Sequence, residues 1–392
     1  MTNFDVVIAG GGVTGCSTAF WLASHPNFNG TIAVVERDPT YANAPSAKAS
    51  GGIRQQFSTP ENVQIGLFGA QFVKSIEERL AVDGESTGVF FREQGYLLLA
   101  TPEALPIMRN AHEVQLANGA DIVFKDCADL EREFPWINVS QLAGAFFGQS
   151  NEGWVDPYSL LQAYRRKARS LGVTFIKDDV ASIDHTGHKA NGVHLREGGL
   201  VSTGTVVNAA GARGALALAR GVGMELPLSS RLRSTFVFEC KENIAHGQLT
   251  VLPNGCAWRP EGSRFITNMA PPPEEDLETF EHEINYTQFD EVIWPSLAEW
   301  VPAFEAIKFS HAYSCHYDFN TLDENLIIDR CGELDNCFVA AGFSGHGMQQ
   351  SPAVGRALSE LICDGRFTTL DLSRFDFGRV QRGEGIHEFN CW

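Results

Sequence analysis

The stretch that decides the fold lies near the start of the chain, where residues 4–37 read FDVVIAGGGVTGCSTAFWLASHPNFNGTIAVVER. Residues 4–9 are a short apolar run with β-branched side chains, which is typical of a buried parallel strand. Residues 16–24 have the composition of a helix, and residues 31–35 are a second apolar run. Strand, helix and strand in this order predict a βαβ unit and therefore a parallel sheet.

The glycines between the first strand and the helix have G-x-G-x-x-G spacing. Gly10 permits a tight turn, Gly12 lets the backbone approach a pyrophosphate, and Gly15 lets the helix pack closely on the strand. Glu36 ends the second strand 21 residues after Gly15, where a carboxylate can accept hydrogen bonds from a ribose 2′-hydroxyl. A lone motif of this kind also occurs in plain loops. The complete βαβ context favours a dinucleotide site, with FAD and NAD both open.

Length and composition describe a globular protein of ordinary make-up. With 392 residues, of which 44% are hydrophobic, the chain can form two domains or one elaborated domain. The net charge of −18 argues against nucleic acid as a partner, because phosphates need a basic face. No apolar run approaches the ~20 residues that span a bilayer. Because the first strand begins at residue 4, there is no room for a signal peptide.

The cysteines are scattered along the chain and odd in number. No C-x-x-C pair occurs, and no Cys/His cluster has zinc spacing, so we expect reduced and mostly buried thiols, no metal site and a cytoplasmic protein. The nine are Cys16, Cys127, Cys240, Cys256, Cys315, Cys331, Cys337, Cys363 and Cys391.

The middle of the chain departs from the βαβ rhythm. Apolar residues at three- and four-residue steps predict one long helix over residues 60–80. Residues 89–91 and 96–100 are expected to be strands, and strand-like segments return after residue 225. This block therefore predicts part of a second domain.

An arginine follows two glycines in residues 49–57, ASGGIRQQF. Gly51 and Gly52 would let a flat ligand approach the backbone, and the planar fork of Arg54 could then bind a carboxylate. The alternative is a solvated arginine in a surface loop.

Two later segments resemble the opening stretch in composition. Residues 205–211 form an apolar run that ends in Ala209, Ala210 and Gly211, as expected either beside a cofactor or in tight strand–helix packing. Residues 337–341 are apolar and lead into the turn GFSGHGM at residues 342–348. A helix expected over residues 349–363 would direct its positive N-terminal end at this turn.

Together these segments resemble the D-amino-acid oxidase/sarcosine oxidase superfamily of FAD-dependent oxidoreductases, nearest its sarcosine and glycine oxidase side. The resemblance runs from Val6 to about Phe375 and is most specific in VNAAG (207–211), WRPEG (258–262) and GFSGHG (342–347). It implies FAD rather than NAD. It also implies α/β plus α+β architecture, with a Rossmann-type FAD domain formed by residues 1–88, 150–224 and 322–392. Residues 89–149 and 225–321 would form a substrate domain on a large mixed or antiparallel sheet.

The family's reaction removes hydride from a C–H bond beside an amine nitrogen and passes it to FAD, after which the imine hydrolyses. On this template Arg54 and Tyr317 lie near the substrate carboxylate, and His346 lies in the turn that faces the flavin. Val180 matches a backbone contact to adenine. The cofactor site implied by the resemblance comprises Gly10, Gly12, Val13, Thr14, Gly15, Glu36, Arg37, Ser50, Gly51, Gly52, Val180, Ala209, Ala210, Gly211, Cys315, Gly342, Gly345, His346, Gly347 and Met348.

Cys315 matches the position at which monomeric sarcosine oxidases attach FAD through a thioether. Covalent attachment here is one reading, and a strand cysteine packed near the flavin is the other.

Two positions depart from the family pattern. Gln349 stands where sarcosine oxidases carry a lysine that helps to bind the substrate carboxylate. Residues 265–267 occupy the strand in which those oxidases carry a lysine that promotes reaction with oxygen. The substrate is expected to be a small carboxylate-bearing amine, and the electron acceptor to be oxygen or another molecule. The alternatives are a 2-hydroxy-acid dehydrogenase and a flavoprotein with a binding or assembly role.

Overall fold

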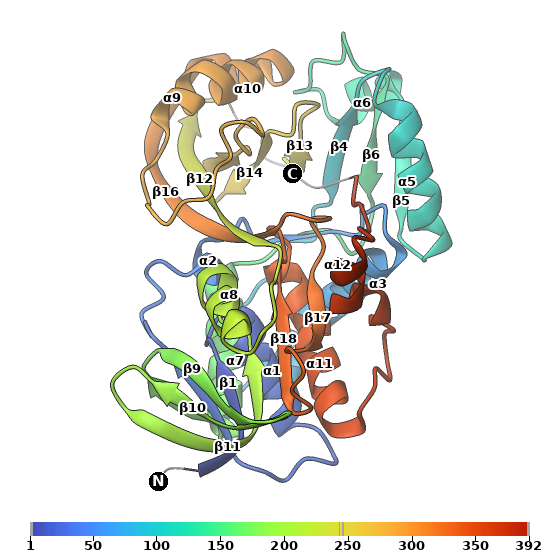
Figure 1. Cartoon of the computed structure of the whole chain (residues 1–392). Helices are drawn as coiled ribbons and strands as arrows, with labels where there is room; N and C mark the ends of the chain where they lie inside the picture. Colours follow the sequence, from blue (N-terminus) through green and yellow to red (C-terminus); the bar gives the residue numbers. More distant parts are fainter. Residues whose placement is uncertain (1–2, 243, 245–246, 390–392) are drawn as a thin grey trace.

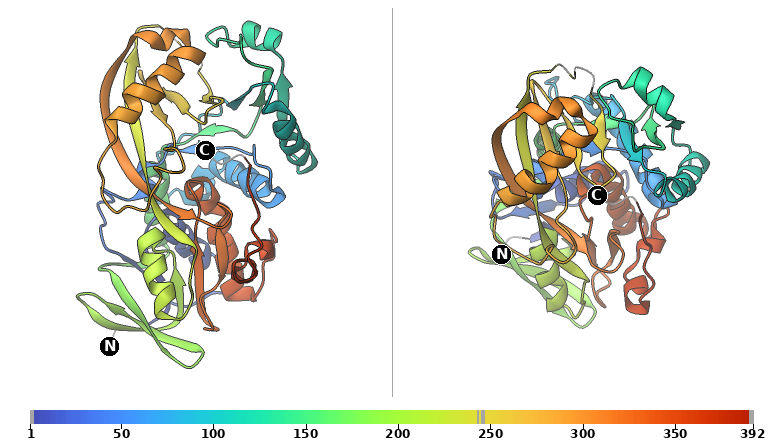
Figure 2. Two further views of the ribbon diagram at one scale, coloured as in Figure 1. Left: turned by 45° about the horizontal axis from the view of Figure 1, so that its top comes forward. Right: turned by 90° about the horizontal axis from the view of Figure 1, so that it is seen from above.

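Two large sheets organise the chain, one above the other in Figure 1. The computed structural model describes residues 3–242, 244 and 247–389. Cys391 and the outermost ends of the predicted domain ranges lie outside these residues. The left view in Figure 2 shows the same division into an upper and a lower part.

The first sheet contains the opening βαβ unit. Its central strand β1 runs parallel to β2 and to β11, which confirms the predicted parallel sheet. The order is β17-β18-β11-β1-β2-β8, and β10 and β9 extend antiparallel from β11. The strands are β1 (Asn3–Ala9), β2 (Ile32–Glu36), β8 (Thr174–Lys177), β9 (Val180–Thr186), β10 (Lys189–Leu195), β11 (Gly199–Asn208), β17 (Ile327–Arg330) and β18 (Cys337–Ala341).

Both faces of this sheet are covered by helices. Along β1, Val7 and Ala9 belong to one core cluster while Val6 and Ile8 belong to another, because side chains alternate between the faces of a strand. Helix α8 (Gly211–Gly221) packs on the first face. Helices α1 (Val13–Ala23) and α11 (Gly347–Asp364) pack on the second. This double cover explains why the strands are apolar throughout instead of alternating.

The second sheet has the order β16-β12-β15-β14-β13-β4-β6-β5. Its neighbouring strands are antiparallel except β13 and β4, which are parallel, so the sheet is mixed, as predicted. The strands are β4 (Tyr96–Ala100), β5 (Ile122–Lys125), β6 (Gly144–Gly148), β12 (Leu228–Cys240), β13 (Leu249–Val251), β14 (Ala257–Glu261), β15 (Arg264–Asn268) and β16 (Ile307–Asn320).

A two-stranded sheet and shorter helices complete the fold. The small sheet pairs β3 (Gly52–Ile53) with β7 (Gly153–Trp154). The remaining helical elements are α2 (Pro45–Lys48), α3 (Pro60–Lys74), α4 (Ile76–Leu80), α5 (Leu105–Ala117), α6 (Cys127–Glu133), α7 (Pro157–Ser170), α9 (Tyr286–Gln288), the π-helix η1 (Phe289–Ile293), α10 (Trp294–Trp300), the 3₁₀ turns η2 (Pro302–Ala306) and η3 (Ser373–Phe375), and α12 (Phe377–Arg382).

We propose the predicted ranges as the two domains. Every strand of the first sheet falls within residues 1–88, 150–224 or 322–392, and every strand of the second within residues 89–149 or 225–321.

Two local predictions were wrong. The helix predicted over residues 60–80 is interrupted at Ser75, whose hydroxyl donates to the carbonyl oxygens of Gln71 and Phe72 and so competes with the helical pattern. Residues 89–91 form no strand. Phe90 is 72% exposed, so this apolar triplet does not mark a buried strand.

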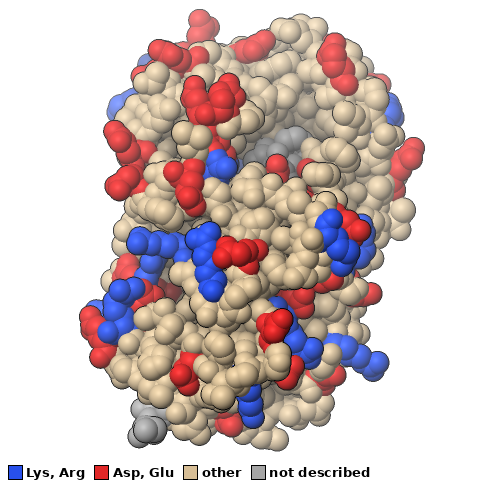
Figure 3. Space-filling model, in the orientation of Figure 1, with Lys and Arg blue, Asp and Glu red and all other residues tan. Residues whose placement is uncertain are grey.

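Charge is distributed unevenly over the face drawn in Figure 3. Asp and Glu side chains gather over the upper part, and Lys and Arg side chains lie mainly at the level of α2 and α8 and below. Within the described residues, no helix combines the length and the apolar character needed to cross a bilayer.

Candidate active site

The glycine turn after β1 leaves room for a ligand at the start of α1. Gly10 has φ +99, and a methyl group there would overlap the carbonyl oxygen of Ala209 on the neighbouring strand. Helix α1 then begins at Val13 with Gly12 at its N-cap and no side-chain cap. The Val13 N–H donates to the Ser46 hydroxyl at 3.0 Å, and the positive end of the first turn, which includes Thr14 and Gly15, favours a phosphate.

Glu36 is oriented toward this turn. Its carboxylate accepts hydrogen bonds from the backbone N–H groups of Gly11 and Asp38, each at 2.8 Å. Burial raises the pKa of Glu36 above its usual value, against the opposing effect of these two hydrogen bonds. Arg37 beside it is exposed, and Val180 at the start of β9 is half-buried.

The second and third small-residue segments lie around the same sheet. The N–H of Ala209 donates to the carbonyl of Ala9 in β1 at 2.9 Å, and Ala210 is the N-cap of α8, which starts at Gly211. The turn after β18 includes Gly342 (φ +77) and leads into α11 at Gly347, with His346 as an N-cap that makes no side-chain cap bond.

Asp318 holds that turn in place. Its carboxylate accepts hydrogen bonds from the N–H groups of Gly342 at 2.9 Å and Phe343 at 3.2 Å. Burial raises its pKa to about 6, although both hydrogen bonds oppose this rise. No sequence motif marks Asp318. It reaches the turn because it lies near the end of β16, beside the turn in the folded chain.

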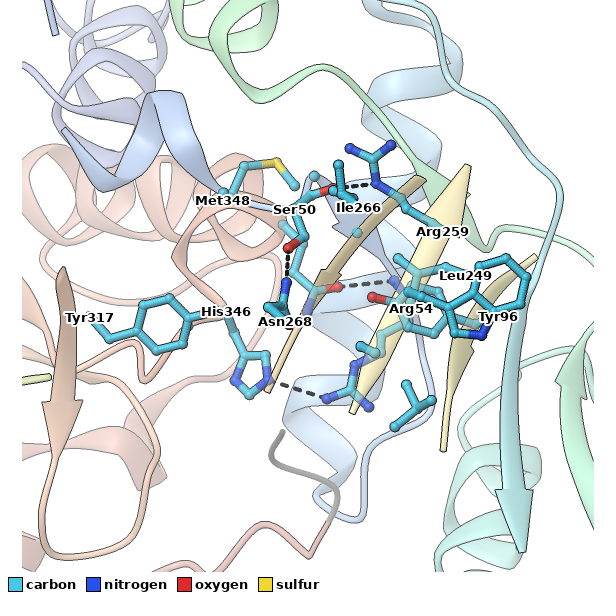
Figure 4. A pocket seen from close by; sticks show the side chains of 18 residues that line it. Ser50, Arg54, Tyr96, Leu249, Arg259, Ile266, Asn268, Tyr317, His346 and Met348 are labelled. Atoms are coloured by element: carbon cyan, nitrogen blue, oxygen red, sulfur yellow. Dashed lines mark hydrogen bonds between the residues drawn. The ribbon is translucent and has the colours of Figure 1, made fainter. Parts of the chain in front are cut away.

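A pocket opens between the two sheets, and Figure 4 shows side chains that line it. Nine of the predicted residues are among its lining: Ser50, Gly51, Gly52, Arg54, Tyr317, Gly345, His346, Met348 and Gln349. The glycine turn after β1, Glu36 and the segment at Ala209 lie outside this pocket. The predicted residues therefore fall into two groups, one at the carboxyl ends of β1, β2 and β11 and one in the pocket.

Arg54 is one of two buried arginines that line the pocket, with only 2% of its surface exposed, and Arg259 is the other. Its guanidinium donates to the carbonyl oxygen of Gln56 at 2.9 Å and to Nε2 of His346 at 3.2 Å (Figure 4). It also lies 4.4 Å from the centre of the Phe57 ring. Both of these hydrogen-bond acceptors are neutral groups.

His346 is neutral in this setting. Burial, together with the nearby charge of Arg54, lowers its pKa to about 3. Because a guanidinium can only donate, Nε2 of His346 is the acceptor and the ring proton lies on Nδ1.

Gln349 supports the backbone of Arg54. Its Oε1 accepts a hydrogen bond from the Arg54 N–H at 2.9 Å. The residue that replaces the expected lysine therefore orients the arginine.

Glu152 is a residue that the sequence analysis missed. Its carboxylate is fully buried and accepts hydrogen bonds from the Gln55 N–H at 2.6 Å and from the Gln56 side chain at 2.8 Å. Burial raises its pKa to about 7, against the lowering effect of these bonds and of Arg54. A single glutamate 98 residues after Arg54 carries no sequence motif, so only the fold could reveal it.

Ser50 is held by hydrogen bonds from Arg259 and Asn268, two residues for which the sequence predicted no role. Arg259 Nε donates to the Ser50 carbonyl at 2.8 Å, and Asn268 Nδ2 donates to its hydroxyl at 2.7 Å (Figure 4). Arg259 also pairs with the carboxylate of Glu261. The WRPEG segment thus contributes a hydrogen bond that shapes the backbone at Ser50.

Cys315 and Tyr317 lie on β16. Cys315 is 4% exposed, and burial raises the pKa of its thiol to about 11. Tyr317 lines the pocket, and burial raises the pKa of its phenol to about 12. Both groups therefore carry their protons at neutral pH.

The family model for FAD dependent oxidoreductase (DAO) matches residues 5–361. The chain belongs to this family. It is 40% identical to FAD-dependent oxidoreductase domain-containing protein 1 of Bos taurus, a match that covers 98% of this chain and 86% of that protein. It is 24% identical to monomeric sarcosine oxidase of Bacillus sp. (strain B-0618), over 99% of both chains. The solved L-proline dehydrogenase of P. horikoshii has the same fold, with a TM-score of 0.88 at 23% identity, over 98% of this chain and 100% of that chain.

The residues of this DAO-family protein fit FAD, its family's cofactor. A methyl group at Gly10 or at Gly345 would overlap the Ala209 carbonyl or the Tyr317 ring, so both glycine turns pass close to their neighbours, and helix α11 starts without a side-chain cap. Glu36 at the end of β2 supplies the acceptor expected for a ribose hydroxyl. We propose the predicted set of cofactor residues on this basis. Among the described residues, no cluster of three or more His, Cys, Asp or Glu side chains could hold a metal ion.

Proposed function

We propose that this flavoprotein oxidises the C–N bond of a small amino acid or N-substituted glycine. FAD supplies the N5 atom that accepts the hydride, and the imine product then hydrolyses in water. The observation that carries the proposal is Arg54, a buried guanidinium in a pocket that is also lined by the Gly345–Met348 end of the turn before α11. A carboxylate substrate brings the opposite charge to this cation.

Arg54 would hold the substrate carboxylate through charge-assisted hydrogen bonds. Gln349 fixes its backbone and His346 fixes its guanidinium, so the donor group is preorganised before substrate arrives. Tyr96, Leu249 and Ile266 give the rest of the pocket a largely apolar wall, which suits a short side chain or an N-alkyl group.

The protonation states favour an amine over a 2-hydroxy acid. Oxidation of a hydroxy acid requires a base that removes the O–H proton. His346, with a pKa of about 3, is a weak base, and Tyr317, with a pKa of about 12, keeps its proton. A neutral amine needs no such base, because the nitrogen lone pair assists departure of the hydride.

The electron acceptor is proposed to be a molecule other than oxygen. None of the described residues that line the pocket is a lysine, and the apolar Ile266 lies on the strand where the resemblance led us to look for one. Arg259 of the neighbouring strand also lines the pocket, but it is paired with Glu261, so it gives less stabilisation to the negative charge that develops on oxygen during its reduction.

An anaerobic substrate panel tests the proposal. The FAD-loaded protein is mixed with sarcosine, proline, iminodiacetate and D-amino acids, with the matching amines that lack the carboxylate, and with 2-hydroxyglutarate. We expect flavin bleaching by at least one carboxylated amine and none by its decarboxylated partner. Reduced flavin should persist for minutes once oxygen is admitted. Bleaching by 2-hydroxyglutarate alone, or by nothing in the panel, would refute the proposal.

We further propose that FAD is bound without a covalent link. The Cys315 thiol is buried and, with a pKa of about 11, is almost fully protonated at neutral pH, whereas thioether formation needs the thiolate. The intact mass of the denatured protein should therefore equal the mass of the polypeptide. A mass increased by one flavin, which disappears in Cys315→Ser, would contradict this.

A further inference from the structure

The last described residues of the chain return to the segment that carries Arg54. Glu388 is only 8% exposed, although it follows an otherwise exposed stretch. Its carboxylate accepts hydrogen bonds from the Ser58 N–H at 2.5 Å, the Ser58 hydroxyl at 2.6 Å and the Thr59 N–H at 3.1 Å. It also accepts one from Asn62 Nδ2 at 3.2 Å.

This contact lies at the beginning of α3. The helix starts at Pro60, and its N-cap Thr59 makes no side-chain cap bond. Glu388, more than 300 residues away in sequence, therefore provides acceptors next to the positive end of the helix, where a carboxylate is favoured.

The other end of the same segment is held by Glu152, which binds the N–H of Gln55. Residues 54–59 are thus fastened between two buried carboxylates from remote parts of the chain. In the middle, Gln115 donates to the Phe57 carbonyl at 3.1 Å. The position of the Arg54 guanidinium depends on the course of this segment, because Arg54 also donates to the Gln56 carbonyl within it.

The C-terminal segment is itself anchored independently of the pocket. The Ile386 N–H donates to Asp323 at 3.0 Å, and Asn325 Nδ2 donates to the Ile386 carbonyl at 2.5 Å. Asp323 in turn forms a buried ion pair with Arg379 of α12. These contacts fix the segment two residues before Glu388.

Apolar packing contributes little to this attachment. Ile386 is half-buried, Phe389 is 67% exposed, and Glu388 is the one buried residue within residues 383–389. Within residues 383–389, the attachment to residues 58–62 consists of the hydrogen bonds to the Glu388 carboxylate and one from the Phe389 N–H to the Ser58 hydroxyl at 2.9 Å.

We propose that Glu388 is a positioning residue for the substrate-binding arginine. The C-terminal segment, residues 383–389, acts as a latch on residues 54–59 and holds Arg54 in the geometry that binds a carboxylate. This role in catalysis rests on the proposed function, whereas the latch itself does not.

The experiment compares Glu388→Gln, Glu388→Ala and the control Glu384→Gln in the full-length, FAD-loaded protein. Glu384 belongs to the same segment, but its side chain is 64% exposed and pairs only with Arg382 among the described residues. Amide hydrogen exchange of residues 54–63 reports on the latch. The dissociation constant of sarcosine or an unreactive analogue such as methylthioacetate, from the flavin spectrum, reports on Arg54, together with KM and kcat.

We expect faster exchange at Ser58 and Thr59 in both Glu388 variants, with Ala exceeding Gln, and wild-type exchange in Glu384→Gln. The dissociation constant of the carboxylate and KM should both rise about tenfold in Glu388→Ala, as expected for losing hydrogen bonds to a charged group. The kcat at saturation should change less than twofold. Unchanged exchange would overturn the latch. Faster exchange with unchanged carboxylate affinity would overturn the positioning role. If the wild-type protein binds no carboxylate, the proposed function fails, and the exchange data still decide the latch.

Discussion

Arg54 illustrates how surroundings turn a common residue into a candidate binding group. A buried arginine is costly unless it is hydrogen-bonded, and Arg54 donates to the Gln56 carbonyl and to His346. The same environment keeps His346 neutral. The described lining of the pocket thus combines two buried arginines, Arg54 and Arg259, with a histidine that is neutral near pH 7.

Replacing Arg54 tests this arrangement directly. Arg54→Ala should raise KM for the best carboxylated amine about 100-fold, the loss expected from two charge-assisted hydrogen bonds. Arg54→Lys should have a KM between those of wild type and Arg54→Ala, since an ammonium keeps the charge but lacks the planar fork. Arg109→Ala, which removes an exposed arginine of α5, is the control. Steady-state kinetics and FAD content give the measurement, and a KM within twofold of wild type in Arg54→Ala would refute the assignment.

Glu152 should make stability depend on pH. Its folded pKa of about 7 lies above the usual 4.5, because burial disfavours the charged form. The stability it contributes is therefore complete below the unfolded pKa and is lost as pH rises through about 7. Relative to Glu152→Gln, the wild-type free energy of unfolding should fall by about 2 kcal/mol between about pH 5.5 and 8. Urea unfolding of both proteins across this range gives the difference, and parallel curves would contradict the prediction.

At the scale of elements, both glycine turns proposed for the cofactor site join a buried strand to a helix whose N-cap residue makes no side-chain cap bond. In the first turn, backbone conformation and close approach coincide at Gly10. Gly172, after α7, has a similar φ of +93 against +99 for Gly10, but nothing lies within 4 Å of a methyl group there. Substitutions at Gly10 and Gly172 can therefore separate the effect of a positive φ from the effect of close contact with a neighbouring segment.

Gly172→Ala should therefore lower the free energy of unfolding by about 1 kcal/mol and leave FAD content unchanged. Gly10→Ala should lose FAD as well, because the methyl group collides with the Ala209 carbonyl and displaces the turn. Flavin absorbance per protein after gel filtration, with thermal unfolding, measures both effects. Equal flavin content in the two variants would show that close approach at Gly10 is unimportant.

For the molecule as a whole, contacts between distant segments join the two sheets to the C-terminal part of the chain. Asp323 follows β16 of the second sheet, and its partner Arg379 lies in α12 at the edge of the first. The ion pair is almost completely buried, with 0% and 2% side-chain exposure, and Arg379 also donates to the Leu326 carbonyl at 2.9 Å.

Asp323→Asn should lower the free energy of unfolding by about 3–5 kcal/mol, because it leaves a buried guanidinium without its counter-charge. Arg382→Ala breaks an exposed pair with Glu384 and should cost less than about 1 kcal/mol. Urea unfolding of FAD-loaded protein provides both values. Similar losses in the two variants would mean that burial of the Asp323 pair is not important.

Much of the fold could be predicted because its elements carry local patterns. The βαβ unit at residues 4–37 and the strand before α11 follow from apolar runs and glycine turns. The break at Ser75 could not be predicted, because a serine hydroxyl either bends a helix or points to solvent depending on its neighbours. The apolar triplet at residues 89–91 was mispredicted for a different reason, since a strand needs a pairing partner as well as an apolar pattern.

The candidate site was only partly accessible from the sequence. Arg54, Tyr317, His346 and Gln349 lie together in the pocket where the resemblance led us to expect them, and their roles remain proposals. Glu152, Arg259 and Glu388 act on the site through hydrogen bonds to segments far away in sequence. No spacing rule connects such residues, because the distance between them is set by sheet topology.

The sequence by itself predicted the opening βαβ unit, a second strand-rich part and an FAD cofactor. These features depend on side-chain alternation, glycine conformation and motif spacing, all of which are local. Only the tertiary structure decided which groups are charged and which segments hold Arg54. Burial shifts the pKa values of Glu152, His346 and Asp318, and burial is a property of the packed chain. The turn at Gly10 could be predicted from the sequence, whereas the latch at Glu388 forms only when α12 packs against the loop after β16.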